Sequence, residues 1–139
     1  MAALGTRLLK LEVGGTEYTA EVSRVAIVAG EGNSDFITFA DAAAGGGREY
    51  SLEFTAVQDL AADTLWDHVW TEAGTEVDFE IIPYGNTAAS AAQPHITGNA
   101  TITEPDGDFI GGEADPSTSS RFTFDCAWVC TAKPQRVLT

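Results

Sequence analysis

Residues 48–83 decide how this chain is interpreted. They read Arg48-Glu-Tyr-Ser-Leu-Glu-Phe-Thr-Ala-Val57, then Asp63-Thr-Leu-Trp-Asp-His-Val-Trp-Thr-Glu-Ala73, then Thr75-Glu-Val-Asp-Phe-Glu-Ile-Ile82. In the first and third runs, apolar residues alternate with acidic or small polar residues. This period of two is typical of a β-strand with one face packed on the core and the other exposed to solvent. The middle run has the spacing of an amphipathic helix. The stretch therefore predicts strand, helix, strand.

The predicted helix at 63–73 has apolar residues at the i, i+3, i+4 and i+7 positions. Its predicted core face consists of Leu65, Trp66, Val69 and Trp70. Asp59 or Asp63 is expected to cap the first turn, and Gly74 to end the helix. Two tryptophans at this spacing are typical of packing against a sheet rather than of a binding site.

The two predicted strands beside this helix each have one acidic face. The predicted inward residues are Tyr50, Leu52, Phe54 and Ala56 in the first strand, and Val77, Phe79 and Ile81 in the second. The acids on the opposite faces are Glu49, Glu53, Glu76, Asp78 and Glu80. One interpretation is an ordinary solvated sheet surface; the other is a surface that repels a negatively charged molecule.

The rest of the chain is also patterned as strands and turns. Gly14-Gly15 between residues 6–13 and 16–22 predicts a tight hairpin. Further strands are expected at 23–29, 35–40, 96–103, 109–112 and 121–130. Loops are expected at 41–47 and 85–94, and an exposed C-terminal arm, interrupted by Pro134, at 132–139. We expect one domain over residues 1–139, mainly β, built as a β-sandwich or partly closed barrel with one flanking helix.

The composition excludes several classes of protein. The chain has 139 residues, 44% of them hydrophobic and 20% charged, which suits a globular domain with a core. Seven Lys and Arg stand against 21 Asp and Glu, a formal charge of −14. Such a balance argues against nucleic-acid binding and against docking on anionic membranes. No apolar run is long enough to span a bilayer, and the first residues lack the plan of a signal peptide, so we expect folding where the chain is made.

No catalytic, cofactor or metal site is predicted. Cys126 and Cys130 lie about 13 Å apart if they share a strand, too far for a disulfide, so both are expected to be buried free thiols. No further metal ligands follow them at zinc-site spacing. The sequence contains no Gly-x-Ser-x-Gly motif, so neither His68 nor His95 is predicted to activate a serine nucleophile. A pair of catalytic carboxylates of the glycosidase type remains an open alternative, because such acids need to be close only in space and not in sequence. The glycines at 45–47 precede Arg48-Glu49, which does not fit a phosphate-binding loop.

Seven segments of the chain carry a family likeness: Phe36 to Leu52, Thr55 to Asp59, Leu65-Trp66 with Trp70, Gly74 to Val77, Pro83 to Asn86, Pro94 to Gly98, and Phe122 to Trp128. Together they resemble the major tail tube proteins of long-tailed bacteriophages of actinobacteria. The resemblance covers about residues 35–134 and is one of layout, since none of its motifs is catalytic.

The resemblance implies a structural subunit of the virion, assembled in the host cytoplasm. Such subunits form rings, expected to be hexameric, that stack into a hollow tube through which DNA leaves without being bound specifically. The implied partners are further copies of the chain and the tape-measure, tail-tip and tail-terminator proteins, without a membrane. The bore-lining acids are expected among Glu49, Glu53, Glu76, Asp78 and Glu80, and the ring-stacking loop at Asp41 and Gly45, Gly46 and Gly47.

A second interpretation is a monomeric β-sandwich that serves in adhesion, in decorating a particle surface or in binding a ligand. It accounts for the acidity and for the strands. It accounts less well for the long pliable loops at 41–47 and 85–94, which fit segments that become ordered on assembly.

Overall fold

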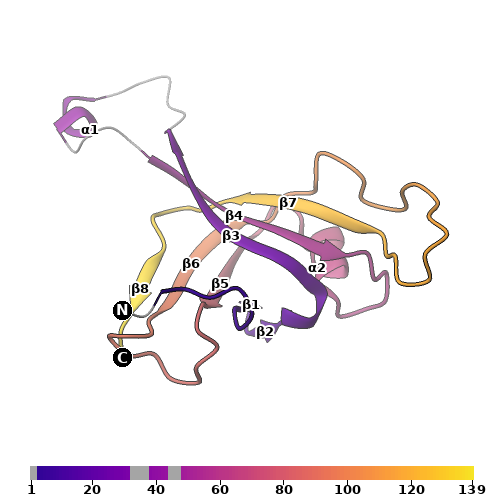
Figure 1. The fold of residues 1–139 in the computed structure, drawn as a ribbon. Helices are drawn as coiled ribbons and strands as arrows, with labels where there is room; N and C mark the ends of the chain where they lie inside the picture. Colours follow the sequence, from indigo (N-terminus) through magenta and orange to yellow (C-terminus); the bar gives the residue numbers. More distant parts are fainter. Residues whose placement is uncertain (1–2, 32–37, 44–47) are drawn as a thin grey trace.

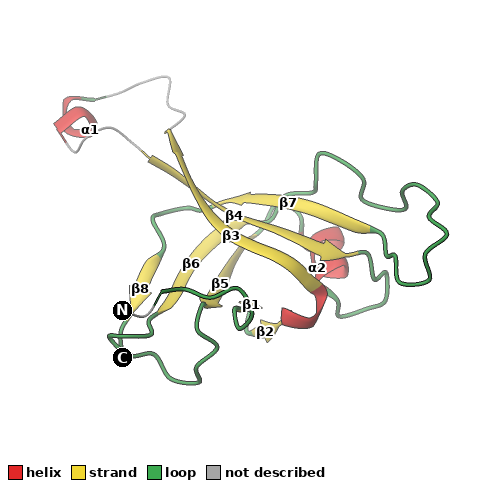
Figure 2. Cartoon of the chain, viewed as in Figure 1, coloured by secondary structure: helices red, strands yellow, loops and turns green. Residues whose placement is uncertain are grey.

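The computed structural model describes residues 3–31, 38–43 and 48–139, which form two antiparallel sheets and a helix beside them (Figure 1, Figure 2). The larger sheet has the order β2-β1-β5-β6-β8, from β1 (Lys10–Val13), β2 (Thr16–Glu17), β5 (Glu76–Ile82), β6 (His95–Thr101) and β8 (Gln135–Val137). The smaller has the order β3-β4-β7, from β3 (Val22–Glu31), β4 (Arg48–Val57) and β7 (Thr123–Val129). The predicted mainly β fold is confirmed at this level, and the sheets do not close into a barrel.

Both sheets turn their apolar faces to one core. The buried residues come from alternate positions of β1, β4, β5 and β7: Leu11, Val13, Leu52, Phe54, Ala56, Phe79, Ile81, Phe124, Cys126 and Trp128. Trp128 is fully buried, and its ring meets Phe54 edge-on at 4.9 Å. The predicted alternation in β4 and β5 is therefore confirmed. Because the inner faces share this core, the outer faces of the two sheets point away from each other.

The hairpin predicted at Gly14-Gly15 joins β1 to β2. Val13 pairs with Thr16, and both glycines have positive φ, 58° and 84°, as a tight two-residue turn requires. The second strand is shorter than expected. A 3-10 turn, η1 (Thr19–Glu21), follows it, and the chain then enters β3 of the other sheet.

Helix α2 (Leu65–Glu72) begins at a different cap from the two predicted. The Thr64 hydroxyl accepts from the Asp67 N–H at 3.1 Å, and the Asp67 carboxylate accepts from the Asp63 N–H. Asp63 adopts φ 66° to make this turn. Thr64 rather than Asp59 or Asp63 is thus the N-cap. Gly74, with φ 93°, follows the helix as predicted.

The predicted core face of this helix is confirmed for three residues and wrong for the fourth. Leu65 and Val69 are fully buried and Trp66 is 5% exposed, but Trp70 is 51% exposed. Trp70 stacks on Trp66, with 5.2 Å between ring centroids and 14° between planes. The spacing places Trp70 on the correct stripe, but its ring packs on Trp66 and Phe109 and not on the sheet.

Four other predictions need correction. Of the strand expected at 35–40, Phe39 and Ala40 lie in a short helix, α1 (Phe39–Ala43), and 35–37 fall outside the described residues. Residues 109–112 form no strand. Alternation along the strand expected at 121–130 places Phe122 inward with Phe124, Cys126 and Trp128, but Phe122 is 47% exposed because it precedes β7. The arm expected at 132–139 contains β8, which pairs with β6 from His95↔Val137 to Thr97↔Gln135.

Candidate functional site

The outer face of the larger sheet carries a row of carboxylates. Glu12 of β1 lies directly opposite Glu17 of β2 on one side and Glu80 of β5 on the other. Asp78 and Glu76 share this face, since they lie two and four residues from Glu80 along the same strand. Five acids therefore gather on one side of this sheet.

Few of these carboxylates are paired with a cation, although Lys10 shares the face of Glu12 on β1 and Lys133 lines a hollow with Asp78 and Glu80. Among the described residues neither Glu12, Glu17 nor Asp78 forms an ion pair, and the nearest partner of Glu80 is the Nδ1 atom of His95, 3.6 Å from its Oε1 atom. Directly opposed side chains in an antiparallel pair have Cβ atoms about 4.5–5.5 Å apart, so like charges there repel. We therefore expect the row to lower the stability of the folded chain by a small amount at low ionic strength.

Glu12 and Glu17 were not among the acids predicted from the sequence. The signal was present, because Lys10-Leu-Glu-Val13 and Thr16-Glu17 alternate across the predicted hairpin. Local alternation gives the face of a residue within its own strand. It does not reveal that β1 pairs with β5, which is more than 60 residues further along the chain.

The outer face of the smaller sheet has a different character. Its cross-strand rows are Val28–Ser51–Val129, Ala26–Glu53–Ala127 and Arg24–Thr55–Asp125. Val28 and Val129 are 38% and 45% exposed, and Glu53 lies 3.4 Å from Arg24. Small and apolar side chains therefore outnumber charges here, and one acid has a cation beside it.

The five acids predicted for a bore consequently divide between two surfaces. Glu49 and Glu53 lie on β4 of the smaller sheet, whereas Glu76, Asp78 and Glu80 lie on β5 of the larger one. Since the outer faces point away from each other, no single bore surface of one subunit can present all five.

Replacing Glu12 with glutamine is expected to stabilise the chain. The change keeps the shape of the side chain and removes repulsion from two directly opposed carboxylates, so the free energy of unfolding should rise by about 0.2–1 kcal/mol at low ionic strength. In 1 M salt, where the Debye length is about 3 Å, the gain should shrink. Urea unfolding at both salt concentrations measures it.

Glu113→Gln is the matched control, because Glu113 is exposed in a loop. An equal gain from both substitutions would show that only net charge, and not the row, is responsible.

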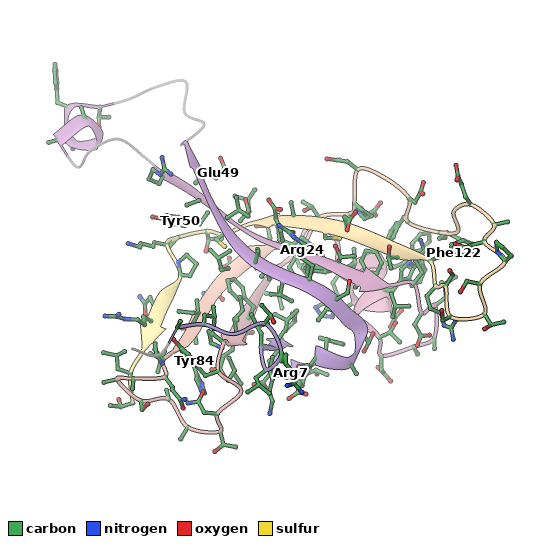
Figure 3. The ribbon with its side chains drawn as sticks, in the orientation of Figure 1. Arg7, Arg24, Glu49, Tyr50, Tyr84 and Phe122 are labelled. Carbon is green, nitrogen blue, oxygen red and sulfur yellow. The ribbon has the colours of Figure 1, made fainter. Side chains whose placement is uncertain are left out.

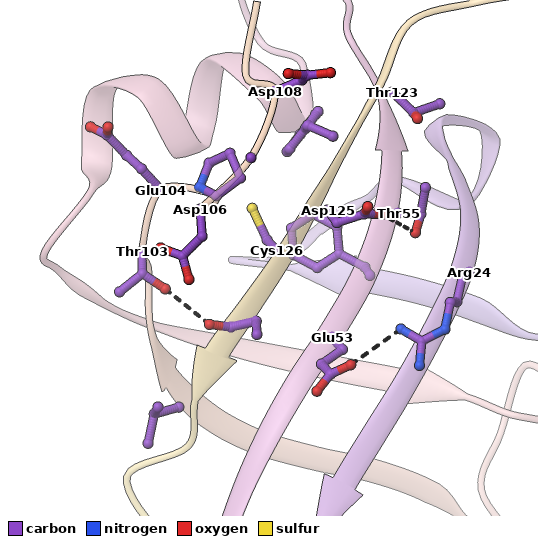
Figure 4. A pocket seen from close by; sticks show the side chains of 16 residues that line it. Arg24, Glu53, Thr55, Thr103, Glu104, Asp106, Asp108, Thr123, Asp125 and Cys126 are labelled. Atoms are coloured by element: carbon purple, nitrogen blue, oxygen red, sulfur yellow. Dashed lines mark hydrogen bonds and ion pairs between the residues drawn. The ribbon is translucent and has the colours of Figure 1, made fainter.

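A groove of about 860 Å³ lies between residues 103–108 and β7 and extends over the outer face of the smaller sheet, where Glu53 and Thr55 of β4 and Arg24 of β3 also line it (Figure 4). Residues 103–108 form one wall, and β7 contributes side chains from both of its faces. The Thr103 hydroxyl donates to the Ala127 carbonyl at 3.0 Å, and the Thr55 hydroxyl donates to Asp125. The lining contains no histidine, so it offers no nucleophile–histidine pair.

A two-stranded arm extends from the smaller sheet. Strands β3 and β4 pair as far as Glu31↔Arg48, while the pairing of β7 with β4 ends at Ser51↔Val129. Figure 1 shows α1 beyond the ends of the two strands, away from both sheets. Phe39, at the start of α1, is 97% exposed.

The predicted ring-stacking loop falls partly on this arm. Asp41 belongs to α1, at the tip of the arm rather than in a loop. Gly45, Gly46 and Gly47 lie outside the described residues. The sequence pattern predicts a strand at Phe39, the apolar residue of the tip, and does not include it in the ring-stacking loop.

The cysteines and histidines form no reactive cluster. Cys126 and Cys130 are buried free thiols, as predicted, and burial raises the pKa of Cys126 to about 12, which keeps the thiol neutral. His95 is buried with Glu80 beside it, and His68 lies on α2. Within the ranges 3–31, 38–43 and 48–139, no group of three or more potential ligands is placed to hold a metal ion.

The helices in those ranges are also too short or too polar to cross a membrane. No protein-family model matches the sequence, and no curated protein matches it either.

Proposed function

We propose that this chain is the structural, non-catalytic subunit of a bacteriophage tail tube. In this proposal its copies form rings, the rings stack, and the stack is a conduit for DNA. The observation that supports it best is the row of opposed carboxylates, Glu17, Glu12 and Glu80, with Asp78 and Glu76 beside it.

A wall of carboxylates suits a duct for DNA. The phosphate backbone binds cations strongly and is repelled by negative charge, so a lysine-poor surface lets DNA move without adhering. Screening restricts this repulsion to roughly 10 Å at moderate salt, which requires the acids to face the duct directly. We therefore assign the outer face of the larger sheet to the bore, and the smaller sheet with Glu49 and Glu53 to other surfaces.

The proposed partners follow from this role. Further copies of the chain make the rings and the stack, and the tape-measure, tail-tip and tail-terminator proteins occupy the bore and the ends. The site of action is the virion, after assembly in the host cytoplasm. Exposed sheet edges and arms that extend from a sheet are common where subunits assemble.

Negative-stain electron microscopy of the purified chain at high concentration tests the proposal. We expect stacked rings or hollow tubes, formed by the chain alone or after adding a tail-tip extract as initiator. Small separate particles under both conditions would reject it in favour of a monomeric adhesion or decoration domain.

A charge reversal tests the assignment of the bore. The triple variant Glu12→Lys, Asp78→Lys, Glu80→Lys should still form tubes but retain DNA, which would slow ejection from particles that carry it. The matched control reverses Glu49 and Glu53, on the other sheet, and should eject normally. Slow ejection from the control and normal ejection from the triple variant would place the smaller sheet at the bore.

A further inference from the structure

The free edge of the smaller sheet borders the groove of about 860 Å³. Strand β7 is the last strand of that sheet, and residues 103–108 run past its free side as the opposite wall of the groove (Figure 4). Figure 3 shows where the sheet lies in the molecule, with Arg24 on β3 and Phe122 just before β7.

The wall bows away from the strand because it is longer than the stretch of β7 beside it. The Thr103 hydroxyl donates to the Ala127 carbonyl, and the rings of Phe109 and Phe124 lie 5.8 Å apart. Between these two contacts the wall advances six residues and β7 only three, which can span about 20 Å and about 10 Å. Cys126, a core residue, also lines the groove, so the groove reaches the strand edge itself. We call this part, between residues 103–108 and the middle of β7, the slot.

The backbone of β7 presents hydrogen-bonding groups to the slot. The Gln58 N–H donates to the Phe122 carbonyl and the Cys130 N–H to the Tyr50 carbonyl, so the even-numbered positions of β7 face β4. The alternate positions of an antiparallel strand then face outward, and Asp125 is one of them. In the described part of the chain, neither its N–H nor its carbonyl has a hydrogen-bond partner. An edge of this kind accepts a further strand.

The slot admits one extended segment and not the edge of another sheet. A strand that belongs to a sheet brings a neighbour about 4.8 Å behind it. Residues 103–108 stand in that position. The occupant is therefore a single segment held between β7 and the wall.

The lining of the groove is acidic. The carboxylates that form no ion pair among the described residues are Glu104, Asp106, Asp108 and Asp125. The cation of the lining, Arg24, lies 3.4 Å from Glu53 and is already paired. Charge complementarity therefore requires a positively charged occupant.

We infer that the slot binds an extended, basic peptide segment of another protein, which adds a fourth strand to the smaller sheet. The backbone of the segment pairs with the N–H and carbonyl of Asp125. Lysine or arginine side chains at alternate positions of the segment lie next to the unpaired carboxylates. One of them continues the cross-strand row Arg24–Thr55–Asp125 on the outer face.

Segments of this chain match the slot poorly. Four of its seven cations belong to strands that are already paired: Lys10, Arg24, Arg48 and Arg136. The other three lie in three different segments: Arg7, Arg121 and Lys133. No segment outside the strands therefore offers two cations, and the net charge of −14 opposes the approach of a second copy. The inference concerns a different partner from those of the tube and does not depend on tube formation.

A labelled synthetic peptide tests the inference on the full chain. The probe is an acetylated and amidated peptide in which four threonines alternate with three lysines, and its binding is measured by fluorescence anisotropy. We expect saturable binding, with slower hydrogen exchange at the Asp125 N–H. The matched peptide carries N-methyl groups on its internal amides, which keep the charge but prevent strand pairing. Equal binding of the two peptides, or no binding of the probe, would overturn the inference.

Two double variants of the chain test the carboxylates. Asp106→Asn with Asp125→Asn keeps the side-chain shapes and should weaken binding of the probe about tenfold. Glu113→Gln with Asp115→Asn removes the same charge from a loop that does not line the groove, and should change binding by less than about twofold. Urea unfolding checks that both variants are folded. An equal loss from the two would mean that net charge alone attracts the peptide, against the inference.

Sedimentation of the chain with and without the probe distinguishes the remaining occupant. Self-association that the probe reverses would identify a second copy in the slot and overturn the inference. We expect the probe to leave the association state unchanged. The proposed function is then decided separately, by the rings or tubes that microscopy shows.

Discussion

Replacing Trp128 with alanine should lower the free energy of unfolding by about 3–5 kcal/mol, the range for deleting a large buried aromatic side chain. Trp128 is fully buried near the C-terminal end of β7 and meets the ring of Phe54. Its indole N–H also donates to the carbonyl of Thr103 at 3.1 Å, so the substitution removes that carbonyl's partner as well as creating a cavity. Urea unfolding of the monomer at low protein concentration measures the loss.

Phe122→Ala is the control for this change. It deletes an aromatic side chain just before the same strand, but one that is 47% exposed, and should cost well under half as much. Equal losses from the two substitutions would mean that β7 is not packed as described.

The two tryptophans of α2 should respond very differently to alanine. Trp66→Ala should cost about 3–5 kcal/mol, because Trp66 is buried and its N–H is bonded to Phe109. Trp70→Ala should cost about 1 kcal/mol, since it loses mainly the stacking contact on one face. The same urea experiment measures both, and a similar large loss from each would restore the original prediction that both belong to the core.

Period-two alternation correctly predicted much of the fold. It placed Leu52, Phe54 and Phe79 in the core because neighbouring side chains on a strand must point to opposite faces. Such patterns are local, so they cannot reveal which strands become neighbours. That is why Glu12 and Glu17 were missed, and why Glu53 and Glu80 were grouped although their strands lie in different sheets.

Two further errors have a common physical cause: the secondary structure of a short segment depends on its tertiary contacts more than on its own sequence. Gln135–Val137 follows Pro134 and looked like a free arm, yet it pairs with the exposed edge of β6. Phe39 looked like part of a strand, but on the arm no neighbouring strand is available and the chain forms one short helix. Propensity alone does not decide between these outcomes.

The unequal burial of the three tryptophans gives the protein an internal optical reporter. Trp128 and Trp66 are shielded from water, and only Trp70 is half open to it. A dissolved quencher should therefore extinguish about one third of the fluorescence, and caesium should do so better than iodide because the net charge attracts cations. Covering Trp70 in an assembly would remove that quenchable third and shift the emission to shorter wavelength. The rate at which unlabelled subunits associate could then be measured by intrinsic tryptophan fluorescence.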